Sequence, residues 1–199
     1  MAFGGFLFLN TLYLQDVRSL SPVSAGLCTL PIAAMTVLCG PIAGRVVGAR
    51  GVRGPLVVGG LGLGVGALML VSLSADTPLG WLLGAYAIFG LGFGAVNPPI
   101  TNTAVSGMPP GQAGVAAAVA TTSRQVGLTL GVALVGGLVT AGLHGSLHDG
   151  LATATHAGWW LIVALGAGIV ALGLAASTAA AQASAERTAA RLHEAPQEA

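Results

Sequence analysis

The sequence contains an uncharged run of 47 residues, from Thr77 to Ser123, without any Asp, Glu, Lys or Arg. In the whole chain only 7% of the residues are charged, against roughly 25% in soluble domains. Too few polar side chains are present to cover a water-soluble core of this length. The net charge of +1 also provides no basic face for nucleic acid. The composition therefore predicts an integral membrane protein that does not bind nucleic acid.

Six apolar segments are separated by short polar or proline-rich breaks. Because about 20 apolar residues span a bilayer as a helix, we predict an all-α, polytopic membrane protein with six helices. The expected helices cover about 1–15, 24–46, 55–75, 79–105, 112–142 and 157–176. The first is short for a full crossing, so the chain is expected to begin inside a helix, as a truncated product or a fragment. The composition of residues 177–199 predicts a disordered tail.

The arginines predict how the helices are oriented. Arg45, Arg50 and Arg53 follow the second expected helix and two more arginines lie in the tail, whereas the opposite loops contain only Arg18. Since cytoplasmic loops are enriched in Lys and Arg, we expect a plasma (inner) membrane protein with a cytoplasmic C-terminus. Four aromatic residues fall at the expected outer ends of helices, where such rings favour the membrane interface: Tyr13, Trp81, Trp159 and Trp160.

Glycine indicates how the helices pack. Many of the 32 glycines are four residues apart, for example Gly60 and Gly64, Gly62 and Gly66, and Gly90 and Gly94. In lipid, small residues at this spacing let helix backbones approach closely. The Gly-x-Gly-x-Gly sequence starting at Gly60 is not a dinucleotide-binding loop, because it lies inside an apolar span with no strand before it. We predict tightly packed helices.

Two expected helices carry polar residues on faces at helical spacing. Asn97 and Thr101 follow two glycines on the fourth, and Thr121 and Arg124 share a face with Ala117, Gly127 and Gly131 on the fifth. The opposite face of the fifth is expected to face lipid and consists of Val115, Val119, Val126, Leu130 and Leu134. We predict that four of these residues line a substrate cavity: Arg124, Thr121, Asn97 and Thr101. Two alternatives remain open. The Arg124 side chain could extend to the headgroups, and the polar side chains of the fourth helix could only hold helices together.

Acid–base chemistry is missing from the expected membrane segments. Asp16, Asp76 and Asp149 fall in loops or at the interface, and the three Glu residues are in the tail. A proton relay needs a buried ionisable carboxylate or histidine, and no triad or paired-carboxylate arrangement is present. We therefore expect no enzyme, no cofactor and no metal site; His144 and His148, four residues apart, are more consistent with an outer loop than with metal binding.

Short motifs occur in a characteristic order along the chain. The first group is Leu12-Tyr13-Leu14-Gln15, Ser21-Pro22, Ala25-Gly26-Leu27, Leu30-Pro31 and Gly40-Pro41-Ile42-Ala43-Gly44-Arg45. The second is Gly90-Leu91-Gly92-Phe93-Gly94, Pro98, Asn102, Val105, Pro109, Gly114, Ser123-Arg124-Gln125-Val126-Gly127 and Gly131-Val132-Ala133-Leu134. From Leu12 to about Val139 the chain resembles the C-terminal half of major facilitator superfamily drug:proton antiporters, most closely the fourteen-helix multidrug efflux subfamily.

The resemblance implies a six-helix half-bundle that works with a missing N-terminal half. The two halves together would export small lipophilic or drug-like compounds in exchange for protons, in contact with membrane lipid, and the coupling carboxylates would lie in the other half. The alternative is a truncated, non-transporting membrane protein or a helix-packing partner of another membrane protein.

The resemblance also points to the loop after the second expected helix. The superfamily has a Gly-x-x-x-Asp-Arg-x-Gly-Arg-Arg pattern in a cytoplasmic loop that latches neighbouring helices. Gly44, Gly51 and Arg53 fit this pattern, but Gly48 occupies the acidic position. Together with Arg45, the three matching residues are candidates for a gating loop without a carboxylate latch. The alternative is that the basic residues only set the orientation.

Overall fold

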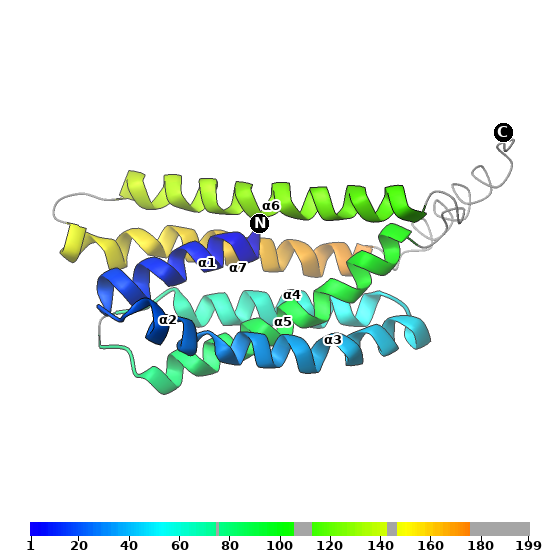
Figure 1. The fold of residues 1–199 in the computed structure, drawn as a ribbon, viewed down its shortest axis with the longest axis horizontal. Coiled ribbons are helices and arrows are strands. Elements are labelled where there is room, and N and C mark those ends of the chain that lie inside the picture. The colour runs from blue at the N-terminus through cyan, green and yellow to red at the C-terminus, as the bar shows by residue number, and fades with distance from the viewer. Residues whose placement is uncertain (75, 106–112, 143–146, 176–199) are drawn as a thin grey trace, which may run out of the picture.

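The computed structural model describes residues 1–74, 76–105, 113–142 and 147–175. Within them the regular elements are helices: α1 (Ala2–Leu12), the π-helix η1 (Tyr13–Val17), α2 (Pro22–Cys28), α3 (Leu30–Arg50), α4 (Arg53–Leu70), α5 (Leu79–Val105), α6 (Ala113–Gly142) and α7 (Leu147–Ala175). The long helices run along the long axis of the molecule (Figure 1). The predicted all-α fold class is confirmed. The predicted tail, 177–199, lies outside the described residues.

Five segments of the described chain are long and apolar enough to span a membrane: Pro22–Arg50, Arg53–Leu70, Leu79–Asn102, Gly114–Gly142 and Ala154–Ala175. The expected first helix corresponds to α1, with 11 residues, continued by η1. The last helix starts at Leu147, ahead of the expected 157, and continues through Gly150.

The second expected helix, 24–46, is divided into α2 and α3. At the junction, Thr29 Oγ1 donates a hydrogen bond to the Gly26 carbonyl over 2.7 Å, and the Ile32 N–H donates to the Thr29 carbonyl. Pro31 has no N–H to donate to the carbonyl four residues earlier. These local bonds replace a regular helical turn, so the span bends near one end.

The loop after the second expected helix is shorter than predicted, because the helix runs past its expected end at 46. α3 continues to Arg50, and α4 begins at Arg53. The helix ends at Gly51, whose φ of 80° lies in the left-handed region that glycine adopts without a Cβ penalty. Gly44 and Arg45 consequently lie inside α3 rather than in a loop. No residue between them and the turn has a conformation that would stop the helix.

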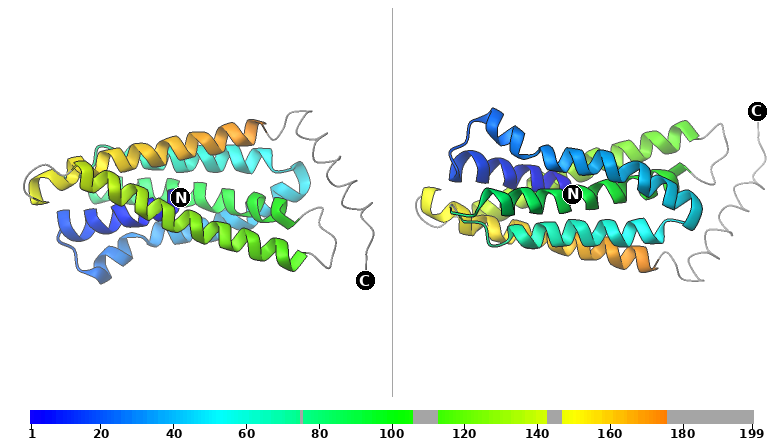
Figure 2. Two further views of the ribbon diagram at one scale, coloured as in Figure 1. Left: turned by 90° about the horizontal axis from the view of Figure 1, so that it is seen from above. Right: turned by 90° about the horizontal axis from the view of Figure 1, so that it is seen from below.

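Glycine brings α4 close to two neighbouring helices, α5 and α7. A Cβ added at Gly62 would lie 2.7 Å from the Gly92 Cα on α5, and one added at Gly60 would lie 2.8 Å from the Gly166 carbonyl oxygen on α7. Real Cβ atoms do not approach other atoms closer than 3.0 Å. The helix backbones therefore touch directly, as the glycine spacing predicted. Figure 2 shows α7 alongside α4.

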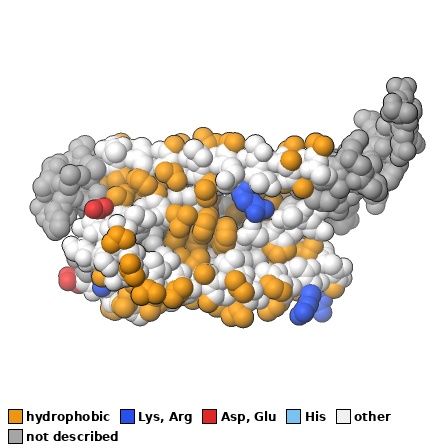
Figure 3. Space-filling model, in the orientation of Figure 1, with side chains coloured by type: hydrophobic (Ala, Val, Ile, Leu, Met, Phe, Trp, Pro, Cys, Tyr) orange, Lys and Arg blue, Asp and Glu red, His pale blue; other side chains and the backbone are white. Residues whose placement is uncertain are grey.

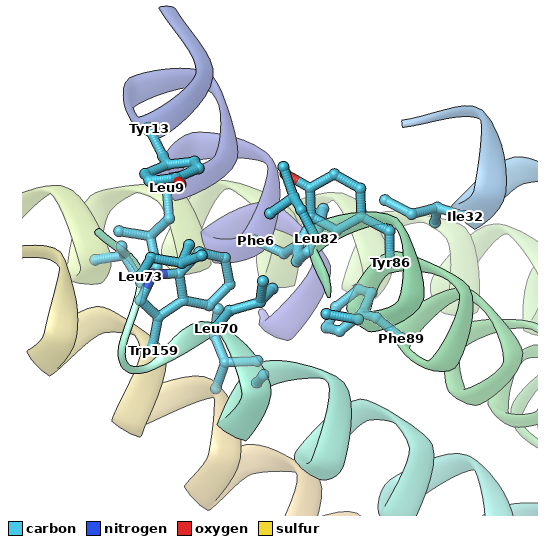
Figure 4. Packing of buried hydrophobic residues seen from close by; sticks show 14 of the residues in the cluster. Phe6, Leu9, Tyr13, Ile32, Leu70, Leu73, Leu82, Tyr86, Phe89 and Trp159 are labelled. Carbon is cyan, nitrogen blue, oxygen red and sulfur yellow. The ribbon is translucent and has the colours of Figure 1, made fainter. Parts of the chain in front are cut away.

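Aromatic side chains fill the core between α1, α5 and α7 (Figure 4). The Phe6 ring stacks on Phe89, with 4.2 Å between ring centroids, and meets Tyr86 and Trp159 edge to face. The Tyr86 hydroxyl donates a hydrogen bond to Asn10 Oδ1, also buried. This cluster fixes α1 against the longer helices.

Two of the four aromatic residues expected at the membrane interface are core residues instead. Trp159 and Tyr13 are each 1% exposed, and the Tyr13 hydroxyl donates a 2.7 Å hydrogen bond to the Ser74 carbonyl. Trp159 meets the Phe6 ring of α1, and both Trp159 and Tyr13 belong to the same buried cluster. Trp81 and Trp160 are about half exposed and remain suitable for an interface.

Candidate functional site: a cavity between α1, α5 and α6

A cavity of about 1140 Å³ lies between α1, α5 and α6, with Leu63 of α4 and Ile169 of α7 completing its wall. Its volume exceeds the range of roughly 300–1,000 Å³ that is common for small-molecule sites. The beginning of α1 reaches α6, where a Cβ added at Gly131 would meet the Met1 backbone. On the face of the molecule drawn in Figure 3, hydrophobic side chains gather in the middle, with a basic side chain beside them.

Two stacked phenylalanines form the apolar centre of the site. The Phe3 and Phe93 ring centroids are 4.2 Å apart, and the ring planes differ by 15°. Both residues also line a smaller groove of about 330 Å³ between α1 and α3. The stacked pair therefore separates two hollows, and each ring is only partly buried.

The polar residues of the cavity come mainly from α6. Ser123, Arg124 and Gln125 line it from this helix, and Asn97 lines it from α5. Arg124 Nη2 donates a 3.4 Å hydrogen bond to Thr101 Oγ1, the only contact of its guanidinium group with the described residues. The described lining includes no Asp or Glu. The cavity thus combines apolar walls with the positive charge of Arg124, and Met1, which carries the chain's amino group, also lines it.

The position of Asn97 depends on a pair of prolines in α5. Pro98 and Pro99 have no N–H groups, so two helical backbone hydrogen bonds are lost. Side chains bond the helix on either side of this point: Asn97 Nδ2 donates to the Phe93 carbonyl over 2.9 Å, and Thr101 Oγ1 donates to the Asn97 carbonyl over 3.1 Å. These bonds leave Asn97 Oδ1 available to accept hydrogen bonds in the cavity.

The structure does not place all four predicted cavity residues in the same way. Arg124 and Asn97 line the cavity, and Thr101 is the partner of Arg124. Thr121 donates to the Ala117 carbonyl over 2.9 Å and does not line the cavity. On the expected lipid face, Val115 and Val119 line the wide end of the cavity.

The gating candidates lie at the opposite end of α3 from η1. Arg45 and Arg53 are exposed and make no hydrogen bond or ion pair with any other residue that the structure describes. A Cβ added at Gly44 would lie 3.9 Å from the Pro98 ring. Gly44, inside α3, is thus close to the part of α5 that carries the prolines.

Sequence reasoning missed the two phenylalanines. Phe93 precedes Asn97 by four residues and shares its face, so the helical spacing contained a signal for it. Phe3 had no such signal, because the short α1 gives no clear face and its partner lies 90 residues later in the sequence.

Arg124 is deep along α6. It lies about 16 Å from the start of the helix at Ala113, at 1.5 Å per residue, in a helix of 30 residues. A charged side chain at such a depth is costly in a bilayer and usually marks a substrate or ion pathway.

Comparison with known proteins identifies the family. Residues 1–132 match the Major Facilitator Superfamily. The chain is 36% identical over 140 residues to the tetracenomycin C resistance and export protein of Streptomyces glaucescens. These aligned residues make up 70% of this chain and 26% of that protein. It is 35% identical over 180 residues to the puromycin resistance protein of Streptomyces alboniger, covering 85% of this chain and 36% of that protein.

A third relative is the multidrug resistance protein Stp of Mycobacterium tuberculosis, 33% identical over 147 residues, which cover 74% of this chain and 27% of Stp. The chain therefore spans about a quarter to a third of the length of these curated relatives. With its helical spans and its match over most of the sequence, the chain is a multi-pass membrane protein that belongs to the Major Facilitator Superfamily.

Proposed function

We propose that this chain forms half of a proton-coupled efflux transporter for small lipophilic or drug-like compounds, and that the cavity between α1, α5 and α6 is its share of the substrate site. The observation that carries the proposal is Arg124, a cation at membrane depth that lines a large apolar cavity. A few polar groups that line an apolar cavity at membrane depth are typical of substrate sites, and Arg124 is exposed toward the open side of this half.

Two further observations support export by a larger protein. Relatives named for drug export and resistance share about a third of their residues with this chain over the matched regions. In superfamily transporters two six-helix halves rock around a central site. A second half would therefore cover the open side of the cavity and would supply the proton-coupling carboxylates, because Asp16 and Asp76 lie at the ends of helices.

We propose that the α3–α4 junction and the C-terminus face the cytoplasm of the plasma membrane. Arg45, Arg50 and Arg53 lie at this end of the bundle, and Trp81 lies half exposed at the other end. This distribution follows the preference of basic residues for the cytoplasmic side. The arginines therefore set the orientation, and any latch would rely on their charge without a carboxylate.

Cysteine labelling tests this orientation. In a background with Cys28 and Cys39 replaced by alanine, Asp76→Cys should react with an impermeant maleimide in intact cells. Val52→Cys should react only after the cells are opened. The opposite pattern would reverse the proposed topology.

Transport by the complete protein tests the function. The full reading frame that contains this sequence, expressed in a bacterial strain without its main efflux pumps, should lower the accumulation of at least one of ethidium, puromycin and tetracenomycin C several-fold. A protonophore should abolish the difference. The 199-residue chain alone, at equal abundance, should leave accumulation unchanged, because its described cavity lining has no carboxylate to carry a proton.

Two results would count against the proposal. Unchanged accumulation of all three compounds by the complete protein would exclude export of this substrate class. Protonophore-sensitive export by the 199-residue chain alone would exclude the division of the transporter into two dependent halves.

A further inference from the structure

We infer that the cavity selects compounds that join a flat aromatic ring system to one acidic group, with the acid bound by Arg124 and the ring placed against Phe93. The inference rests on the proposed function and adds a substrate class to it. According to this inference, this half of the site does not prefer cationic substrates.

The charge of the cavity carries the first step. Arg124 has five N–H donors, and the structure gives it one bond, the long one to Thr101. No acidic residue lines the described part of the cavity. The Arg124 side chain is exposed in this half alone, and a partner half over the open side of the cavity would remove water from it. A cation without a counter-charge in such surroundings attracts an anion strongly, because the local dielectric constant is low.

The shape of the cationic group carries the second step. The planar guanidinium fork can bind both oxygens of a carboxylate at once. Bonding to Thr101 holds one end of the fork on the α5 side of the cavity. The remaining donors have no partner among the described residues, so they are available to the acidic group of a substrate.

The aromatic pair carries the third step. Phe3 and Phe93 stack on each other and both line the cavity. Ring systems favour offset stacking and edge-to-face packing, and the partly buried rings leave surface for a third ring. Asn97, four residues from Phe93, keeps Oδ1 as an acceptor. A flat ring against Phe93 with a polar substituent toward α6 would satisfy all of these groups.

A matched pair of fluorescent compounds tests the inference. 1-Pyrenebutyrate and 1-pyrenebutyramide share the same ring system and differ in the charge at the end of the chain. In cells that express the complete transporter, we expect export of the acid to be at least about tenfold faster than export of the amide, the ratio expected for one charge-assisted hydrogen-bonded pair.

Three substitutions assign the effect to residues. Arg124→Gln should slow export of the acid roughly ten- to a hundredfold and leave export of the amide unchanged, whereas Arg124→Lys should keep part of the preference. Phe93→Leu should slow both compounds by a similar factor, of about two to ten, since it removes ring stacking only. Thr140→Ala, which removes an exposed hydroxyl near the end of α6 outside the cavity, is the control and should leave both rates unchanged.

The outcomes separate this inference from the proposed function. The inference is overturned if the wild type exports acid and amide equally. It is also overturned by a second result, in which Arg124→Gln and Arg124→Lys, at normal abundance, lose export of acid and amide equally. The second result would show that Arg124 neutralises a carboxylate elsewhere in the transporter. Export of ethidium or puromycin without export of the acid would also overturn it while the function stands. If no compound is exported, the proposed function fails.

Discussion

Gly92→Val should prevent the chain from forming a stable bundle. A Cβ at this position would lie 2.4 Å from the Leu63 backbone nitrogen and 2.7 Å from the Gly59 carbonyl oxygen. Because both are backbone atoms, no side chain can rotate away, and α4 and α5 must separate. Overpacking usually costs about 1–3 kcal/mol, and we expect about 3 kcal/mol or more for a clash with the backbone.

The control for this substitution lies on the same helix. Gly84 has no atom within 4 Å of the position of an added Cβ, so Gly84→Val makes the same chemical change without the clash. Thermal unfolding in detergent, followed by circular dichroism, should show a much lower midpoint for Gly92→Val than for Gly84→Val. Equal midpoints would mean that α4 and α5 are not packed as closely as the structure shows.

Trp159→Ala should be the most damaging substitution in the aromatic core, with an expected loss of about 3–5 kcal/mol. The ring is enclosed and lies beside Leu9, Leu70 and Leu73 (Figure 4). Its Nε1–H is buried without a hydrogen-bond partner in the described structure. An unsatisfied donor of this kind costs about 1–3 kcal/mol. Trp159→Phe removes this donor, which offsets part of the lost packing, so it should lower the unfolding free energy by less than about 1.5 kcal/mol.

The neighbouring tryptophan provides the comparison. Trp160 is 55% exposed, and Trp160→Ala should change the unfolding free energy by less than about 0.5 kcal/mol. We expect the loss of unfolding free energy to decrease in the order Trp159→Ala, Trp159→Phe, Trp160→Ala. This order can be measured by SDS titration of the folded fraction. A Trp160→Ala variant as unstable as Trp159→Ala would contradict the assignment of Trp159 to the core.

The helical spacing predicted which residues share a face, but not what each face meets. On α5, Gly90 and Gly94 pack against α3, where added Cβ atoms would meet Ile32 and Thr36. Asn97 continues the same stripe, yet it lines the cavity. α5 crosses its neighbours obliquely (Figure 1), so one stripe changes partner along its length. A crossing angle of this kind depends on all the packed helices and is not encoded in one segment.

Polarity alone also divided α6 incorrectly at its N-terminal end. The sequence assigned Val115 and Val119 to lipid and Thr121 to the interior, because apolar residues usually face lipid in a membrane helix. In the structure the two valines line the cavity, while the Thr121 hydroxyl bonds within its own helix. A substrate cavity for lipophilic compounds has apolar walls, so hydrophobicity cannot distinguish it from a lipid-facing surface.

Burial of Tyr13 and Trp159 was equally hidden in the sequence. Both lie at the end of the bundle where the membrane interface was expected, and aromatic residues are common in either environment. The burial of these rings depends on the packing of α1 and η1 at this end of the bundle. The short helix, which looked too short to span a bilayer, supplies Phe6 and Leu9 to the core.

The glycines of α4 restrict how this helix can change during evolution. At Gly59, Gly60, Gly62 and Gly66, any side chain would meet the backbone of α5 or α7 at 3.0 Å or less. At Gly54 the space is open, and at Gly64 the nearest atom is 3.9 Å away. Substitution is therefore blocked at the four glycines that face α5 and α7 and open at Gly54 and Gly64. Changes to the cavity that keep the packing of α4 intact are therefore confined to side chains that line it, mainly on α6 and on the cavity-facing side of α5.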